Sequence, residues 1–450
     1  MENLDVMKQY GLFDANVPRY TSYPPANRFK AGIGQRNQFL WLANTPSERN
    51  VSIYVHIPFC RRLCWFCACR TQGTKTRSTL NTYIDTLTKE FDAVSKIIGA
   101  RLTMERLHLG GGTPTLLSLP QLQKLLSTVF SEFSIGKNFE FSVEIDPTEV
   151  SSEILRELRK WGMNRASIGV QDFNPVVQKA IGRLQSFEQT QKLVNQLRGE
   201  GVSNINFDLL YGLPYQTEAS LLKTVNKVAL LKPERIALYG YAHVPHASKR
   251  QVMIDVNALP STRTRYFMAK QSASKLGLLG YRKIGIDHFA KTTDGLVKAA
   301  DKGRLRRNFQ GYTDDNCPTL IGFGASAISK FPEGYSQNAV STSAYAERIS
   351  DIGIAGHKGY AMKGDDAMIA RMIEMLMCYY AVDLSEIDDL FPDFGKRQYY
   401  IDRILAEFPG IFKKKQNKLS IVHGYEEIVR IIAASLDLHS ITPTNHSPAI

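Results

Sequence analysis

The chain has 450 residues, a formal net charge of +13, 43% hydrophobic and 22% charged residues. This is the composition of an ordinary globular protein, and it excludes a low-complexity or short-period repeat protein. Because the length exceeds that of one compact domain, we expect one large domain with a smaller satellite.

The N-terminal region predicts a cytoplasmic protein. Its first residues, MENLD, are acidic and lack the basic and apolar regions of an export signal. The most apolar stretch, at 368–382, contains Arg371 and Glu374, so we expect no membrane span and no membrane partner. Residues 1–45 do not share the pattern of the later elements, and we expect an ordered N-terminal arm there, around PRYTSYP at 18–24.

From about residue 51, short β-rich apolar runs alternate with longer segments of helical spacing. Strands are predicted at 51–57, 105–109, 139–145, 165–170, 205–211 and 235–241, and helices at 80–98, 119–133, 151–161, 187–200 and 218–231. This alternation predicts parallel strands with right-handed crossovers. Six units without a clear seventh and eighth predict an α/β fold, a partial (β/α)6 TIM-like barrel over 46–280. A doubly wound sheet is the alternative, because strand order is invisible in the sequence.

Chemically suggestive residues follow the predicted strands. Cys60 comes after the first strand, the glycines at 110–112 after the second, Glu144 at the end of the third and Gln171 after the fourth. Active sites in both candidate folds lie at the carboxyl ends of the strands. We therefore expect the active site at that end.

Beyond about residue 346 the pattern becomes helical, with a predicted hairpin at 411–422 that turns at 416–417 and a helix at 426–436. We expect a mainly helical, winged-helix-like domain over 346–450, with disorder beyond about residue 440. Such modules can bind DNA, but a packing role is favoured for an appendage to a catalytic barrel. No basic run is interleaved with aromatic residues, so no nucleic-acid partner is expected.

Four of the six cysteines lie at positions 60, 64, 67 and 69. This spacing is too tight for a disulfide framework and is typical of metal ligation. Three thiolates from Cys60, Cys64 and Cys67 would leave one iron of a cubane open to another ligand. A zinc site with Cys69 as fourth ligand is the alternative, but no second cysteine or histidine pair lies at zinc-finger distance. Cys317 and Cys378 lie in apolar contexts and are expected to be buried thiols.

The CXXXCXXC motif, with Phe66 before its last cysteine, resembles the signature of the radical S-adenosylmethionine (SAM) superfamily. The rest of the chain resembles one branch, the oxygen-independent coproporphyrinogen III oxidases. The matching segments are PRYTSYP (18–24), YVHIPFC (54–60), GGGTPT (110–115), VEIDP (143–147), GVQDF (169–173), DLLYGLP (208–214), YAHVP (241–245) and NFQGYT (308–313).

This resemblance implies the cofactors, substrate and partners. It implies a 4Fe–4S cluster, two SAM molecules and the oxidative decarboxylation of two propionates of coproporphyrinogen III to vinyl groups, giving protoporphyrinogen IX in haem biosynthesis. It also implies a monomer and a reduced donor such as flavodoxin or ferredoxin. The positive net charge, with Arg19 in the arm, suits a substrate that carries four propionates.

The resemblance also implies the site residues. Cluster ligands are Cys60, Cys64 and Cys67; the SAM-contacting residues are Tyr54, Phe66, Gly111, Gly112, Thr113, Glu144, Gln171, Arg183, Asp208, Ala242 and Ile328. Phe309 and Gln310 lie in a segment, 281–345, that is implied to close the site over the second SAM.

Glu144 and Cys69 are the candidate catalytic residues. Cys69 is expected to handle the substrate or its radical, since a fourth thiolate would block the open iron. One rival is a haem-binding chaperone, whose relatives generally lack Cys69 and PRYTSYP. The other is a different tetrapyrrole-modifying radical enzyme.

Overall fold

The computed structural model describes residues 2–74, 76–392, 395–439 and 449. The disorder expected beyond residue 440 therefore concerns a segment outside the described residues. None of the helices in the described part is both long and apolar enough to span a membrane.

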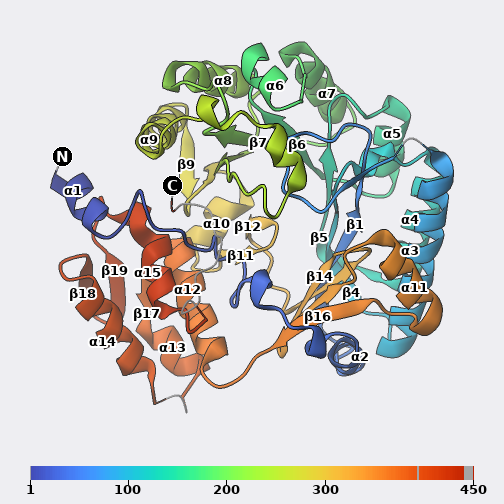
Figure 1. Ribbon diagram of the computed structural model, residues 1–450. Helices are drawn as coiled ribbons and strands as arrows, with labels where there is room; N and C mark the ends of the chain where they lie inside the picture. Colours follow the sequence, from blue (N-terminus) through green and yellow to red (C-terminus); the bar gives the residue numbers. More distant parts are fainter. Residues whose placement is uncertain (1, 75, 393–394, 440–448, 450) are drawn as a thin grey trace.

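A twelve-stranded sheet forms the centre of the molecule, in the order β16-β15-β14-β13-β1-β4-β5-β6-β7-β8-β10-β9 (Figure 1). The six predicted strands are β1 (Asn50–Ile57), β4 (Thr103–Gly111), β5 (Ser134–Ile145), β6 (Arg165–Gln171), β7 (Asn204–Tyr211) and β8 (Arg235–Gly240). They are parallel, and their order across the sheet is their order along the chain. In a doubly wound sheet the strand order would instead reverse at one point of the sheet. The partial-barrel prediction is confirmed.

Helices cover the outer face of this curved sheet (Figure 1). They are α3 (Arg77–Ile98), α4 (Leu119–Glu132), α5 (Ser152–Lys160), α6 (Pro175–Ala180), α7 (Phe187–Gly199), α8 (Glu218–Leu230) and α9 (Thr262–Leu278). Several begin where the sequence supplies a cap: Ser118, Ser186 and Thr217 each form a capping box with the residue three positions later. β5 begins five residues earlier than predicted because Ser134 and Ile135 pair with the start of β4.

Later strands extend the sheet at both edges. β10 (His288–Lys291) and β9 (Tyr281–Ile284) add antiparallel beyond β8. β13 (Thr319–Phe323) pairs parallel with β1, and β14 (Ile328–Phe331), β15 (Gly334–Asn338) and β16 (Gly356–Ala361) continue antiparallel from it. β16 thus lies beyond the boundary expected at residue 345 yet pairs within the same sheet. The domain division itself stays a prediction. α10 (Gly295–Asp301) and the hairpin of β11 (Arg306–Asn308) and β12 (Gly311–Thr313) connect β10 to β13, whereas α11 (Thr342–Ile352) connects β15 to β16.

The arm and the C-terminal region share a second core, separate from that of the barrel. Met7, Leu12, Tyr20 and Tyr23 of the arm are buried together with the C-terminal helices. The elements of this core are α1 (Glu2–Gln9) in the arm, then α12 (Asp366–Tyr379), β17 (Ala381–Asp383), α13 (Leu384–Leu390), α14 (Arg397–Glu407), β18 (Phe412–Lys415), β19 (Lys418–Ile421) and α15 (Val429–Leu436). The other helix of the arm, α2 (Gln35–Ala43), instead buries Trp41 and Leu42 in the barrel core. The predicted hairpin is confirmed as β18 and β19. This shared core supports the packing role.

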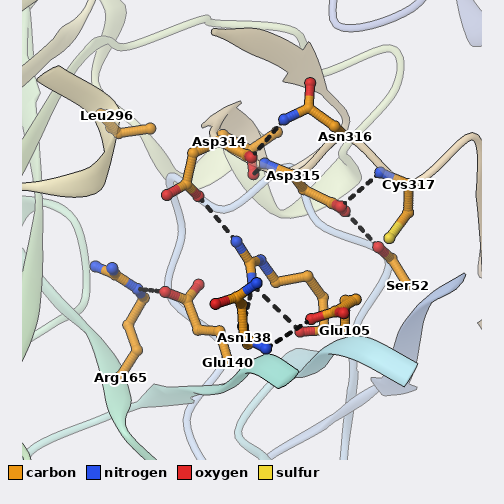
Figure 2. Close-up of polar contacts among 12 residues, drawn as sticks. Ser52, Glu105, Asn138, Glu140, Arg165, Leu296, Asp314, Asp315, Asn316 and Cys317 are labelled. Carbon is orange, nitrogen blue, oxygen red and sulfur yellow. Dashed lines mark hydrogen bonds and ion pairs between the residues drawn. The ribbon is translucent and has the colours of Figure 1, made fainter. Parts of the chain in front are cut away.

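A charged layer closes the floor of the barrel, at the amino ends of the strands (Figure 2). Arg165 pairs with Glu140 at 2.7 Å, and Arg106 with Asp314 at 3.3 Å. The loop after β12 completes this floor, where the Asp315 carboxylate accepts a hydrogen bond from the Cys317 amide at 2.9 Å. Cys317 is therefore half-buried in a polar loop, and the apolar setting expected for it is wrong.

Candidate active site

The loop after β1 carries the three cysteines at the carboxyl end of the barrel. Cys60 ends the short strand β2 (Phe59–Cys60), Cys64 is buried and Cys67 is half-buried. The Trp65 amide donates to the carbonyl of Ile181 at 3.0 Å, which ties the loop to the end of α6. The three thiols thus come from one short, anchored loop.

A second anchor is the turn η4 (Lys249–Met253) with the residue before it. Ser248 Oγ donates to the Cys67 carbonyl at 2.8 Å, and Gln251 Nε2 donates to the Phe66 carbonyl at 2.8 Å and to that of Ala242 at 3.2 Å. These supports were missed by sequence reasoning. Their bonds to the carbonyls of Cys67 and Phe66 join residues about 180 positions apart, so no local pattern signals them.

Positive charge stands beside the cysteines. Arg183 Nη1 lies 3.6 Å from Cys64 Sγ and 3.1 Å from Asp146 Oδ2, and Nη2 donates to the Gly169 carbonyl at 2.9 Å. Hydrogen bonds from Cys69, together with the charges of Arg250 and Arg183, lower the pKa of Cys67 although burial opposes this. The loop therefore favours a thiolate at Cys67, the form that binds metals.

The glycines after β4 bring the backbone close to the cysteine loop. The Gly112 amide donates to the Ile57 carbonyl and the Thr113 amide to that of Phe59, both at 2.8 Å. A Cβ on Gly112 would lie 2.5 Å from the Phe59 carbonyl oxygen. A Cβ on Gly111, which has φ +109°, would lie 2.5 Å from the His56 ring. Only glycine fits at either position.

Glu144, at the end of β5, lies against this glycine turn. Its Oε2 accepts a hydrogen bond from the Gly111 amide at 3.0 Å, and its Oε1 lies 3.2 Å from His108 Nε2. Burial would raise the pKa of Glu144, but the bonds from His108 and Gly111 prevail and lower it. Tyr54 stacks on His108 at 5.7 Å and bonds to His56 at 2.8 Å. Both histidines, which could have been core residues, thus belong to the site.

The neighbouring strands add polar groups next to Glu144. Asp208 on β7 accepts hydrogen bonds from Ser167 at 3.0 Å and Asn206 at 2.9 Å. Burial and the nearby charge of Glu144 raise the pKa of Asp208. Gln171 is the last residue of β6 and has φ +64°. The side chains of Gln171 and Arg183 both lie beside Gly169, where a Cβ would be 3.0 Å from Gln171 Nε2 and 3.1 Å from Arg183 Nη2. The carboxyl ends of β4 to β7 therefore form one polar cradle that faces the cysteine loop.

Phe309, Gln310 and Ile328 come from the opposite wall and not from the parallel strands. The Phe309 ring lies 5.9 Å from that of Tyr335, and Ile328 packs against the cluster that contains Tyr335. Gln310 lines an interior cavity together with His108 and Asn206. This wall thus shares the barrel interior with the cradle.

These residues fit an iron–sulfur cluster with a bound polar ligand. Three thiols on one loop are the usual cluster ligands. Arg183 Nε and Asn206 Oδ1 are buried without a hydrogen-bond partner among the described residues, so polar groups remain for a ligand. No three His, Cys, Asp or Glu side chains in the described ranges gather around the position of a single metal ion.

We expect Glu144→Ala to keep the cluster and to bind SAM at least about ten-fold more weakly, because a charged hydrogen-bond acceptor is lost from the cradle. Equilibrium dialysis with labelled SAM on the cluster-loaded protein measures this, and SAM cleavage should fall as well. Glu149→Ala, which removes a nearby carboxylate paired with Arg61 at 3.4 Å, is the matched control. Unchanged SAM binding in Glu144→Ala would remove Glu144 from the site.

Known proteins share this sequence and fold. Residues 54–228 match the radical SAM superfamily. The chain is 44% identical to an oxygen-independent coproporphyrinogen III oxidase of Cereibacter sphaeroides over 451 residues, covering 100% of both. It is 38% identical to the Escherichia coli protein of the same name, covering 84% of this chain and 82% of that one. The solved structure of coproporphyrinogen III oxidase from Escherichia coli, described as a radical SAM enzyme, matches with a TM-score of 0.88 and 33% identity, covering 94% of this chain and 100% of that one.

Proposed function

The chain belongs to the oxygen-independent coproporphyrinogen III oxidases of the radical SAM superfamily, and from this premise we propose that it decarboxylates two propionates of coproporphyrinogen III to vinyl groups. The observation that carries the proposal is an end-to-end match to these oxidases in a chain whose three-cysteine loop faces a polar cradle. The product is protoporphyrinogen IX, an intermediate of haem biosynthesis.

In this proposal Cys60, Cys64 and Cys67 hold a 4Fe–4S cluster. The cluster and SAM, when bound, supply the radical chemistry that activates the substrate. Glu144 receives the ammonium group of SAM, since its lowered pKa keeps it charged. Arg183, beside Cys64, offsets negative charge on the thiolates.

Other residues shape the SAM site by contact and by exclusion of water. Gly111 and Gly112 let the backbone approach the ligand, and Asp208 suits its ribose hydroxyls. Tyr54, Phe66, Thr113, Gln171 and Ala242 complete the walls. The barrel and its charged floor keep water from the reaction.

We propose that a second SAM binds against the wall that carries Phe309 and Gln310. Support comes from the Phe309 ring, which packs on that of Tyr335 opposite the cradle, and from Gln310, which lines the interior cavity. Equilibrium dialysis on the cluster-loaded protein should give two SAM per chain, and a stoichiometry of one contradicts this.

We further propose a monomeric, cytoplasmic enzyme that receives electrons from a reduced flavodoxin or ferredoxin. The net charge of +13 would attract an acidic electron carrier as well as the anionic substrate. Sedimentation measures the oligomeric state. Anaerobic reduction of the cluster by each carrier, followed by its visible absorption, identifies the donor.

The deciding experiment is anaerobic incubation of the cluster-loaded protein with SAM, a reductant and coproporphyrinogen III. Protoporphyrinogen should form with release of two CO2 per molecule, measured by chromatography after oxidation of the porphyrinogens. Tight haem binding without turnover would instead favour the chaperone, and SAM cleavage with a different tetrapyrrole product would favour the second rival.

A further inference from the structure

Glu90 is a carboxylate sealed inside the protein, away from the cysteine loop. It lies on α3 and is 1% exposed. Its oxygens accept hydrogen bonds from three uncharged donors, namely the Gly324 amide at 2.8 Å, Tyr345 Oη at 2.7 Å and Asn338 Nδ2 at 2.7 Å. Burial raises the pKa of Glu90 to about 7. Burying a carboxylate costs free energy, and here only its three hydrogen bonds offset that cost.

The bonds to Glu90 hold the turn between β13 and β14, residues 324–327. Gly324 and Ser326 both have positive φ, at +96° and +64°. Asn338 holds the turn at both ends. Its side-chain Nδ2 donates to the Gly324 carbonyl at 3.0 Å, and its backbone N–H donates to the Ala327 carbonyl at 2.9 Å. The strained turn therefore depends on buried side-chain partners.

Tyr83 joins the same turn to β1. Its Oη accepts a hydrogen bond from the Ala325 amide at 2.9 Å and donates to the His56 carbonyl at 2.7 Å. A Cβ on Gly324 would lie 2.5 Å from Tyr83 Oη, so the approach requires glycine. Tyr83 and Glu90 are seven residues apart and share one face of α3. One helix face thus fixes the turn relative to β1.

The two segments tied by α3 lead directly into the proposed SAM site. His56 precedes the loop that begins at Cys60, and the turn leads into Ile328, the first residue of β14. Ile328 packs against the aromatic cluster of Phe29, Tyr335 and Tyr360. A change in the turn would therefore move Ile328 relative to the cysteine loop.

We infer that Glu90 is a positioning residue: it holds the 324–327 turn so that Ile328 meets SAM at a fixed distance from the cysteine loop. This inference rests on the proposed contact between Ile328 and SAM. Glu90 itself touches neither SAM nor the cluster ligands.

The first test uses the metal-free protein and needs no activity. Glu90→Leu removes all three hydrogen bonds and leaves buried donors unpaired, whereas Glu90→Gln keeps an oxygen for Gly324 and Tyr345 but turns an amide donor toward Asn338. Hydrogen exchange of the Gly324 and Ala325 amides should accelerate at least about five-fold in Glu90→Gln and more in Glu90→Leu. Asp92→Asn, a surface change on the same helix, should leave both amides unchanged.

The second test measures SAM binding to the cluster-loaded variants by dialysis. The dissociation constant should rise at least about five-fold in Glu90→Gln, with iron content and the cluster's visible spectrum as in the unaltered protein. Tyr345→Phe, which removes one donor to Glu90, should give a smaller rise and guards against misfolding of the other variants.

Two outcomes would overturn the inference. One is faster exchange throughout the barrel with loss of iron, which would make Glu90 a residue of general stability. The other is an unchanged dissociation constant for SAM in Glu90→Gln despite faster hydrogen exchange at the turn. Failure of the proposed function would look different, because the unaltered protein would then bind SAM without converting coproporphyrinogen III.

Discussion

Replacement of Cys60, Cys64 or Cys67 by serine is expected to abolish the broad visible absorption of the anaerobically reconstituted protein, its iron and all SAM cleavage. The three thiols come from one loop, and each holds one iron of the proposed cluster. A serine hydroxyl is not a soft ligand and stays protonated at neutral pH, so it cannot replace a thiolate. Iron analysis, absorption spectra and the release of methionine from SAM measure the three effects.

Cys317→Ser is the matched control for these variants. It makes the same change in the polar loop at the barrel floor, far from the carboxyl ends of the strands. Circular dichroism of the metal-free proteins separates loss of the cluster from loss of the fold. A full cluster retained in any of the three serine variants would refute the ligand assignment.

The barrel could be predicted because two patterns agree in its strands. Apolar residues face the helices, and polar residues alternate with them and line the interior. Ser52, His108, Ser142, Ser167 and Asn206, from five strands, border one interior cavity. This alternation is visible in the sequence. It could have assigned His56 and His108 to the site, since a core histidine would interrupt an otherwise apolar face.

The supports of the site could not be predicted in the same way. Ser248 and Gln251 hold the cysteine loop through backbone carbonyls, which have no signature in the sequence. The sequence indicates only weakly that Glu90 is buried, because it lies among the apolar residues Tyr83, Leu87 and Val94 on one face of α3. Its partners at 324 and 338 are more than 230 residues away, so only the fold reveals the network.

Cys69 is expected to be separable from the cluster. Its thiol donates a hydrogen bond to Cys67, and this bond, with burial and the nearby charge of Glu144, raises the pKa of Cys69. A serine hydroxyl can still donate a hydrogen bond to Cys67. Cys69→Ser should therefore keep the iron content, the visible spectrum and SAM binding near those of the unaltered protein.

Porphyrinogen turnover by Cys69→Ser should nevertheless fall about 100-fold or more, the range seen when a group that transfers a proton or hydrogen is lost. The proposed role is direct handling of the substrate or its radical, which a hydroxyl performs poorly because its O–H bond is stronger than S–H. The measurement is protoporphyrinogen formed per SAM cleaved, since cleavage uncoupled from product would place the defect after SAM. Loss of iron from Cys69→Ser would make Cys69 a structural ligand of the cluster, and unaltered turnover would show that Cys69 has no role in the reaction. The spacing argues against a structural ligand, because three thiolates would already hold the proposed cluster and its fourth iron must stay open for SAM.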